Sequence, residues 1–455
     1  MILGLYRLLQ PVLERLFGLI VSAMELLIRR RPGLQAKLGK LIQTYRMRRP
    51  RGIPAYLEMD YEALRNKKPI WIHAASGEYE YAKPLVRALK ERGETVFVTY
   101  FSPTYRSAIE KDPGVAASCP LPLDNASEIR DLIVRLQPRC LLIARTDTWP
   151  NLIYESSRKR VPSLLFSATF HALSARVGGL AGALTRATYP YLTTAHGVTA
   201  EDCRLLESFG VQHTEPAGDT RYDQVLARLA MAKPLIPGLP DPLHENVLVA
   251  GSIWPEDIEN TLPGLIQEIQ GRRTLSAILV PHEISKELIE SLSAFIRARG
   301  LKVATYSHLE TTSDEKQKDE KQKIDVLIVD RVGILAELYQ LGRLAFVGGS
   351  FRKTVHSVME PLAAGCITFV GPKHLNNREA IEFQSERLPH LGYSPVICTN
   401  DAEEFREKLH AVLTALGSLP EDSNDVRNTI QDMVRVRGGA TKKALDWIEG
   451  LSSRR

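Results

Sequence analysis

Short apolar runs alternate with amphipathic stretches along most of the chain. Stretches such as 83–92, 125–136 and 285–299 have the apolar spacing of half-buried helices. Apolar runs of strand length lie at 69–75, 95–101, 140–146, 161–168, 192–195, 246–252, 276–282, 302–307, 325–330, 344–349 and 367–371. Because strands that alternate with helices form parallel sheets covered on both faces, the pattern predicts an α/β protein.

The predicted strands fall into two sets. Between them the segment 234–243 reads PLIPGLPDPL, and its four prolines and one glycine cannot continue a helix or a strand. A chain of 455 residues is also too long for one compact core. We therefore expect two Rossmann-like, doubly wound domains, the first over 51–233 and the second over 244–455, with 234–243 as a Pro-rich linker.

The first 50 residues have a different character. The run from Ile2 to Ile28 is strongly apolar, but Pro11 and four charged residues interrupt it. A spanning helix needs about 20 nearly uncharged residues, so an amphipathic helix lying in the membrane interface is favoured over a true span. The alternative is a soluble helix packed on the first domain.

A strongly basic stretch follows this run. Nine Lys or Arg residues lie between Arg29 and Arg51, and no Asp or Glu occurs between Leu26 and Leu57. This basic collar comprises Arg29, Arg30, Arg31, Lys37, Lys40, Arg46, Arg48, Arg49 and Arg51. Such a collar is attracted to anionic lipid and marks the cytoplasmic side of a membrane, so residues 1–50 are predicted to anchor the protein there.

Composition narrows the class of protein. The content of 44% hydrophobic and 25% charged residues is that of a folded globular chain, and a net charge of only +6 does not indicate a nucleic-acid binder. The five cysteines are scattered and form no CxxC pair. A disulfide framework or a zinc knuckle is therefore not expected, and a reducing cytosol fits best.

Glycine-containing turns follow two strands of the second set. Gly251-Ser252 ends one strand, and Gly348-Gly349-Ser350 ends another, with Arg352 and Lys353 next. Glycine lets backbone amides approach a phosphate, helix N-termini add partial positive charge, and parallel sheets bind ligands beyond the carboxyl ends of their strands. The sequence therefore predicts a nucleotide-phosphate ligand in the second domain.

In the first set, polar residues also follow strands. His73-Ala-Ala-Ser-Gly-Glu78 follows the first strand, and a carboxylate there would face a crevice between the domains. The competing interpretation is an ordinary acid at a helix N-terminus, stabilised by the helix dipole. Arg145-Thr-Asp-Thr-Trp149-Pro150-Asn151 follows another strand, where packing at a helix start and a functional role are equally favoured.

Together these motifs resemble the 3-deoxy-D-manno-octulosonic acid (Kdo) transferases of lipopolysaccharide synthesis, over nearly the whole chain. The segments that carry the resemblance, in matching order and spacing, are PIWIHAASGEYEYAKPLV, TYFSPTYRSA, TDTWPNLI, GDTRYD, AGSIWPED, FVGGS, HSVMEPLAAG and GPKHLNNREA. The resemblance implies a GT-B fold, in which two domains face a central cleft. It also implies an inverting transfer of Kdo from CMP-Kdo to a hydroxyl of a lipid A precursor, without a metal ion, at the cytoplasmic face of the inner membrane.

The resemblance also assigns roles to residues. Glu78 matches the general base, which would take the proton of the acceptor hydroxyl. Glu360 matches an acid expected near the CMP ribose, and His282 stands where many members have an arginine that helps to hold the donor. The remaining donor-side positions are Ser252, Gly348, Gly349, Ser350, Asn376, Arg378 and Glu379.

The chain departs from the family pattern at several of these places. The family has one more residue between Ser76 and Gly77, so Glu80 is an alternative to Glu78 as the base. Arg145 stands where many members have an acid. Two other functions are therefore kept: a GT-B transferase with another nucleotide sugar or lipid acceptor, and a catalytically inactive, membrane-bound relative that acts as a scaffold.

Overall fold

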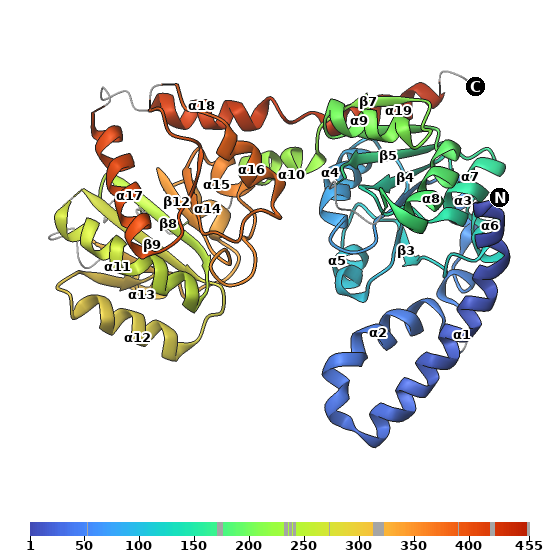
Figure 1. Cartoon of the computed structure of the whole chain (residues 1–455), viewed down its shortest axis with the longest axis horizontal. Helices are drawn as coiled ribbons and strands as arrows, with labels where there is room; N and C mark the ends of the chain where they lie inside the picture. The colour runs from blue at the N-terminus through green and yellow to red at the C-terminus, as the bar shows by residue number, and fades with distance from the viewer. Residues whose placement is uncertain are drawn as a thin grey trace. The chain divides into compact units, whose positions relative to one another are not determined.

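A computed structural model describes residues 1–51, 53–170, 176–231, 235, 239, 243–272, 274–312, 323–389, 391–418 and 424–452 (Figure 1). The chain forms two compact units. The first unit comprises Met1–Gln224 and Arg437–Arg455, and the second comprises Val225–Val436. The division falls inside helix α10 (Thr220–Ala230), whereas most of the predicted linker 234–243 lies outside the described residues.

Within the described residues, the first unit contains a sheet of seven parallel strands in the order β3-β2-β1-β4-β5-β6-β7. Its strands are β1 (Ile70–His73), β2 (Val96–Tyr100), β3 (Ala117–Pro120), β4 (Cys140–Ala144), β5 (Ser163–Ala168), β6 (Thr194–Gly197) and β7 (Thr214–Pro216). Every residue of the central strands β1 and β4 is buried, as expected for strands covered on both faces.

Helices cover both faces of this sheet. They are α3 (Tyr61–Asn66), α4 (Tyr79–Glu91), α5 (Arg106–Glu110), α6 (Ala126–Leu136), α7 (Pro150–Arg158), α8 (Gly179–Thr188), α9 (Ala200–Ser208) and α19 (Ala440–Ser452), with 3₁₀ turns η2 (Ala55–Leu57), η3 (Pro103–Tyr105) and η4 (Tyr189–Tyr191). One hydrophobic core joins Trp71 and Leu141 to the buried faces of α6 and α7. A second core joins Ile72 and Leu142 to α4 and to Leu445 of α19.

The second unit is built on the same plan. Its described residues form a parallel sheet in the order β10-β11-β9-β8-β12-β13-β14. The strands are β8 (Asn246–Ile253), β9 (Leu275–Pro281), β10 (Val303–Thr305), β11 (Val326–Ile328), β12 (Leu344–Val347), β13 (Ile367–Val370) and β14 (Val396–Cys398). The helices are α11 (Pro255–Gly271), α12 (Lys286–Arg297), α13 (Tyr306–Thr312), α14 (Leu335–Tyr339), α15 (Met359–Ala363), α16 (Arg378–Ser385), α17 (Ala402–Gly417) and α18 (Asn424–Arg435). The predicted α/β class with two doubly wound parallel sheets is confirmed.

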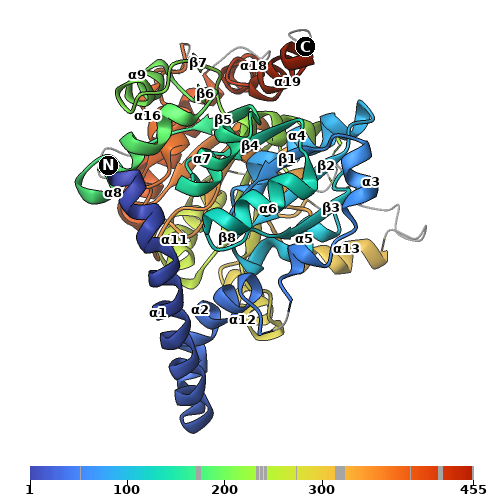
Figure 2. The ribbon, with the colours of Figure 1, turned by 90° about the vertical axis from the view of Figure 1, so that its right-hand side faces the viewer.

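The N-terminal segment forms a helical hairpin on the first unit. Helix α1 (Ile2–Arg30) and helix α2 (Gln35–Arg48) are joined by the 3₁₀ turn η1 (Pro32–Leu34) and lie side by side in both views (Figures 1 and 2). Within the described residues no helix is long and apolar enough to cross a membrane. The polar residues that interrupt α1 hold it to the unit: Tyr6 Oη donates a 2.8 Å hydrogen bond to Asp124, and Arg7 pairs with the buried Glu155.

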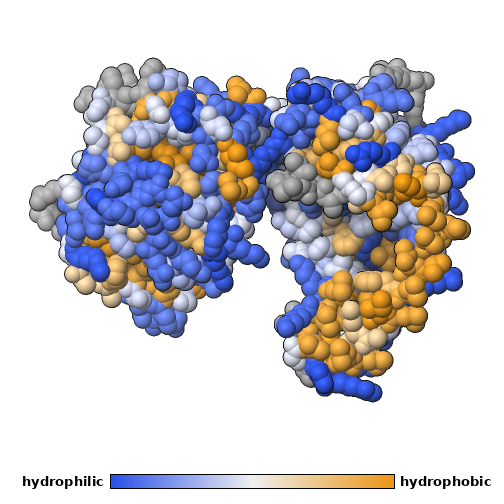
Figure 3. Space-filling view, viewed as in Figure 1, coloured by the Kyte–Doolittle hydropathy of each residue, from blue (hydrophilic) through white to orange (hydrophobic). Residues whose placement is uncertain are grey.

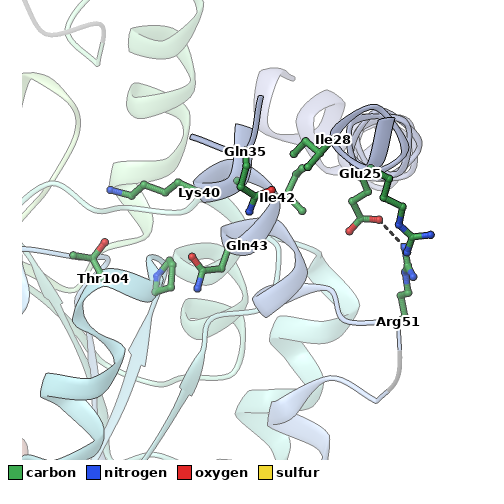
Figure 4. Close-up of a pocket in the computed structure, with 11 residues that line it drawn as sticks. Glu25, Ile28, Gln35, Lys40, Ile42, Gln43, Arg51 and Thr104 are labelled. Atoms are coloured by element: carbon green, nitrogen blue, oxygen red, sulfur yellow. Dashed lines mark hydrogen bonds and ion pairs between the residues drawn. The ribbon is translucent and has the colours of Figure 1, made fainter. Parts of the chain in front are cut away.

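The outer face of α1 is apolar and exposed. Leu8 is 73% exposed and Leu19 is 69% exposed, and the hairpin forms a broad hydrophobic surface (Figure 3). Within the hairpin, α1, α2 and η3 line a pocket of about 890 Å³ in which Glu25 pairs with Arg51 (Figure 4).

Two features differ from the sequence-based expectation. The C-terminal residues from 437 to 452, predicted to belong to the second domain, pack on the first unit, because the apolar face of α19 joins its second core. The basic collar is also smaller than predicted. Arg46 and Arg51 pair with Glu25, Arg49 pairs with Glu14 and Glu128, and Arg48 is buried, so these four arginines interact with groups of the protein itself. The other five collar members, Arg29, Arg30, Arg31, Lys37 and Lys40, are exposed to solvent, as is Arg51.

Candidate functional site

Strand order places one candidate site in each unit. In the first sheet the chain runs from β1 outward through β2 and β3, then returns to β4 on the other side of β1. In the second sheet the corresponding neighbours are β8 and β12. Doubly wound sheets bind ligands beyond the carboxyl ends of their strands at such a reversal. His73 ends β1, and the predicted residues Ser252 and Gly348 lie at the ends of β8 and β12.

His73 links three segments at the reversal in the first unit. Its imidazole is fully buried, and Nε2 lies 3.0 Å from Asp147 Oδ2. On its other side Nδ1 lies 3.0 Å from Thr99 Oγ1, which accepts a 2.9 Å hydrogen bond from Trp71 Nε1. The carbonyl oxygen of Thr99 lies 3.2 Å from the same Nδ1, and together these contacts fix the loop after β4 against β1 and β2.

Glu78 occupies the position just before α4 and is half-buried. Its Oε2 accepts a 3.0 Å hydrogen bond from the backbone amide of Ser76, which fixes the carboxylate near the helix N-terminus. Glu80 forms a 2.6 Å surface ion pair with Lys83. Burial and the carboxylates of Glu80 and Glu78 raise the pKa of Tyr105, so its hydroxyl lies within electrostatic range of both acids.

Trp149 and Pro150 start helix α7, as the packing interpretation predicted. The Trp149 ring stacks on Phe101 with centroids 5.2 Å apart. The Arg48 guanidinium lies 4.1 Å from the Phe101 centroid and donates hydrogen bonds to the carbonyls of Leu121 and Pro122. Burial lowers the pKa of Arg48 to about 10. The hairpin therefore supplies a buried arginine to the carboxyl-end side of this sheet.

The glycine turn of the second unit is held by a buried acid. Asp257 Oδ2 accepts a 2.7 Å hydrogen bond from the amide of Gly349 and a 2.9 Å bond from that of Trp254. Its Oδ1 accepts a 3.1 Å bond from the amide of Phe351, and the amide of Gly348 donates to Gly251 O. These amides already have acceptors, so the turn is not the open phosphate cradle that its glycines predicted.

Close backbone approach explains the two glycines. A Cβ at Gly348 would lie 2.2 Å from Ser252 O, and Gly349 has a φ of +89°. Ser252 itself has a φ of +54°, a backbone conformation that residues other than glycine rarely adopt. It lies at the bulge where the register between β8 and β9 shifts. Backbone strain of this kind is often found at functional sites. The Gly348 turn and Ser252 therefore touch each other, as the predicted site requires.

Three rings stack beside this turn. The rings of Trp254 and His282 have centroids 4.1 Å apart, and those of His282 and His356 lie 4.8 Å apart and nearly parallel. Trp254 Nε1 donates a 3.2 Å hydrogen bond to His356 Nε2, and the Arg352 guanidinium lies 3.7 Å from the Trp254 centroid. Burial, and secondly His282, lower the pKa of His356. Cationic and aromatic groups thus gather at the reversal of the second sheet.

Of the remaining predicted residues, Ser350 belongs to the turn and Asn376 contacts a residue that packs against it. Ser350 is buried and has a packing role, because its Oγ accepts a 2.7 Å hydrogen bond from Gly371 N. Glu360 on α15 forms an ion pair with Arg228 at 2.5 Å. Asn376 binds Thr354, whose carbonyl faces Gly349, whereas Arg378 and Glu379 form the first turn of α16. Among the described residues no group of three or more His, Cys, Asp or Glu side chains could hold a metal ion.

Sequence reasoning missed the residues that organise this site. Asp257 and His356 lay inside the motifs AGSIWPED and HSVMEPLAAG, and Arg352 was noted after the glycine turn, but none of the three was assigned a role at the site. The role of Asp257 depends on the Gly349 turn, 92 residues later, which local pattern does not reveal.

The two doubly wound parallel sheets have the GT-B arrangement, and comparison with known proteins shows that the chain is a glycosyltransferase. Residues 47–224 match the family model of the 3-deoxy-D-manno-octulosonic-acid transferases (kdotransferases). A 3-deoxy-D-manno-octulosonic acid transferase of Bordetella pertussis is 30% identical over 401 residues, which cover 84% of this chain and 87% of the relative. One of Aquifex aeolicus is 29% identical over 315 residues, which cover 68% of this chain and 78% of the relative. The chain belongs to the Kdo transferase family.

A solved structure agrees with the fold. The UDP-GlcNAc 2-epimerase of Neisseria meningitidis, crystallised with UDP-GlcNAc, superposes with a TM-score of 0.53 at 14% identity. The match covers 83% of this chain and 98% of the epimerase. At that identity the likeness concerns the arrangement of strands and helices, and it assigns no activity.

Proposed function

We propose that this transferase moves Kdo from CMP-Kdo to a hydroxyl of a lipid A precursor, with inversion and without a metal ion, at the cytoplasmic face of the inner membrane. The observation that carries the proposal is the family match over 84% of the chain. The Glu78 segment and the Gly348 turn, both part of that resemblance, lie at the strand-order reversals of their sheets.

On the acceptor side, Glu78 is the general base. A hydroxyl becomes a good nucleophile only as its proton leaves, and a carboxylate can take that proton. The Ser76 amide holds one oxygen of Glu78, which leaves the other to receive the proton. CMP is a good leaving group, so no cation is needed to weaken the bond that breaks.

On the donor side, the charged groups of CMP-Kdo are bound mainly by side chains and less by backbone amides. The amides of Gly348, Gly349 and Phe351 have protein acceptors, so the compensating charge comes from Arg352, with His282 and Trp254 as a flat surface beside it. Glu360 remains the candidate for the ribose hydroxyls, which would compete with Arg228 for its carboxylate.

The hairpin supports the proposed location. An amphipathic helix binds an interface through its apolar face, aided by cationic residues near anionic headgroups. The exposed leucines of α1, followed in the chain by the exposed Arg29, Arg30 and Arg31, combine these two features. A lipid acceptor would then be reached without leaving the membrane surface.

Incubation of the purified full-length protein with CMP-Kdo and lipid A precursor in detergent micelles, followed by mass spectrometry, tests the proposal. We expect a mass increase of one or more Kdo residues, and no product with CMP-sialic acid or a UDP-sugar. Product from another nucleotide sugar alone would favour the alternative donor. Binding of CMP without transfer from any donor would favour the inactive scaffold, which the altered Ser76–Gly77 spacing motivates.

A further inference from the structure

Two arginine side chains flank one buried tyrosine at the reversal of the first sheet. The guanidinium carbon of Arg145 lies 4.9 Å from the centroid of the Tyr81 ring, and that of Arg221 lies 5.3 Å from it. Arg221 Nη1 also donates a 3.2 Å hydrogen bond to Tyr81 Oη. A guanidinium is planar and matches a carboxylate or a phosphate in shape, and contact with an aromatic ring holds it in place.

The backbone holds these groups in fixed places. Thr220 Oγ1 donates a 2.7 Å hydrogen bond to the carbonyl of Tyr81, and the Thr220 amide donates a 3.0 Å bond to Ser167 Oγ. These bonds tie the starts of α10 and α4 to the end of β5. Arg145 directly follows β4, with a φ of +57° and its amide bonded to Phe166 O. A left-handed arginine there is strained, and strain of this kind is often stored at functional sites.

Arg145 has an unsatisfied donor. Its Nε is buried and has no hydrogen-bond partner in the part of the chain that the structure describes. A buried donor of a charged group without a partner is costly, and a bound oxyanion would remove that cost.

The arginine pair belongs to the same region as the candidate base. Tyr105 lies beside Gly77, and its pKa responds to burial, to Glu80 and Glu78, and in the opposite direction to Arg221. Arg221 and Glu78 therefore lie within electrostatic range of one hydroxyl. A ligand that presents its hydroxyl to Glu78 would have its neighbouring substituents near the arginines.

We propose that Arg145 and Arg221 bind an oxyanion of the acceptor, either a phosphate or a sugar-acid carboxylate, and so orient its hydroxyl toward Glu78. The proposal rests on the proposed function for the identity of the acceptor. It makes the two arginines specificity-determining residues for an anionic acceptor, and it assigns them no role in donor binding.

The test measures acceptor binding without the donor, by calorimetry in detergent micelles with the full-length protein. Three lipids are compared: the bisphosphorylated lipid A precursor, the same lipid with both phosphates removed, and that dephosphorylated lipid carrying one Kdo. We expect Arg145→Gln to weaken binding of an anionic lipid about tenfold or more, because a charged hydrogen bond is lost. Binding of the uncharged lipid should not change.

Comparison of the three lipids identifies which group of the acceptor supplies the oxyanion. A tenfold loss with the bisphosphorylated lipid assigns a phosphate, whereas a loss confined to the Kdo-bearing lipid assigns a carboxylate. Arg145→Lys should restore only part of the affinity, because a lysine keeps the charge and lacks the planar fork. Arg158→Gln removes an exposed arginine at the end of α7 and is the matched control.

Two results would overturn the proposal. One is unchanged binding of both anionic lipids by Arg145→Gln, and the other is an equal loss with all three lipids. Thermal unfolding of each variant shows whether an equal loss of affinity comes from misfolding. If Arg145→Gln is misfolded, the affinities of the milder variant Arg145→Lys for the three lipids decide whether the proposal holds. A wild-type protein that binds anionic acceptor through Arg145 but transfers no Kdo would refute the proposed function and leave this site in place.

Discussion

The buried carboxylate of Asp257 accepts a 2.7 Å hydrogen bond from the backbone amide of Gly349. The same carboxylate accepts from the amides of Trp254 and Phe351, so one side chain joins the start of α11 to the turn after β12. An acid in the first turn of a helix is usually a local cap. Here it also fixes the loop that brings Arg352 over Trp254.

Asp257→Asn should destabilise the second unit by about 2–4 kcal/mol, because the NH2 of the new amide would face a backbone N–H and cannot accept its hydrogen bond. Urea unfolding measures the loss, and calorimetry with CMP should show weaker binding. Glu256→Gln is the matched control. Glu256 makes only a loose 3.7 Å pair with Arg352 at the surface, so its loss should cost less than about 0.5 kcal/mol. Equal stability of the two variants would refute the role of Asp257.

The local pattern of apolar residues was sufficient to predict the central strands of both sheets. All eleven predicted strands form, and most of them are apolar and buried on both faces, whereas the edge strand β10 is only partly buried. The three strands without a prediction are β3, β7 and β14. Two of them have three residues each, and β3 carries Ser118 and Pro120 in four residues. In the described part of the chain these strands lie at or beside sheet edges, where packing demands little of the sequence.

Contacts between residues that are far apart in the chain could not be predicted from the sequence. The apolar spacing of α19 predicts a helix but does not tell which sheet it covers. Likewise, the basic collar is a true cluster of charge, yet Arg49 finds Glu14 and Glu128 only in the folded chain. The glycines at 348 and 349 did mark a close turn, but the acceptor for its amides was the distant Asp257. Composition can predict charge and turns, and only the fold decides which of them remain available to a ligand.

Substitution of exposed leucines on α1 should release the protein from membranes without unfolding it. Full burial of a leucine is worth about 1.5–3 kcal/mol, so Leu8→Gln with Leu19→Gln should lower membrane partitioning at least about tenfold. Sedimentation with vesicles that contain anionic lipid measures the effect. Deletion of the whole helix is a poorer test, because it would also remove Tyr6 and Arg7, which bind Asp124 and Glu155 of the first unit.

Val332→Gln, a change at an exposed apolar residue of the second unit, is the control and should leave partitioning unchanged. Thermal unfolding should be similar for all three proteins, because these positions are on the surface. Full sedimentation of the double variant would show that α1 is not the membrane contact.

Acid should destabilise the first unit through His196. Burial lowers the pKa of this histidine to about 4 from 6.5, and its Nδ1 is buried without a hydrogen-bond partner among the described residues. Between those values the unfolded chain binds a proton that the folded protein does not. Stability is therefore complete above pH 6.5 and decreases as the pH falls toward 4, by at most about 1.4 kcal/mol per pH unit.

Urea unfolding from pH 7.5 to pH 5 measures that slope. His196→Gln should reduce it by the contribution of one proton, whereas His213→Gln, at an exposed position, should not. The same slope in wild type and His196→Gln would exclude His196 as the source.

Glu78→Gln should separate chemistry from binding. The glutamine oxygen can still accept the Ser76 amide, so the local structure survives while the base is lost. General-base assistance is worth about 10²- to 10⁴-fold in rate, and the turnover of Kdo transfer should fall by a factor in that range. Calorimetry with CMP should show unchanged affinity, because Glu78 lies in the first unit and the predicted nucleotide site in the second.

Glu80→Gln is the matched comparison two residues away. It removes only the surface ion pair with Lys83, which is worth well under 1 kcal/mol, so turnover should change by less than about threefold. The opposite pattern, with activity lost in Glu80→Gln and kept in Glu78→Gln, would show that the missing residue before Gly77 has moved the base by two positions. Full activity in both variants would mean that neither acid takes the proton. The base would then have to be sought among the other polar groups at this reversal, beginning with the paired Asp147 and His73.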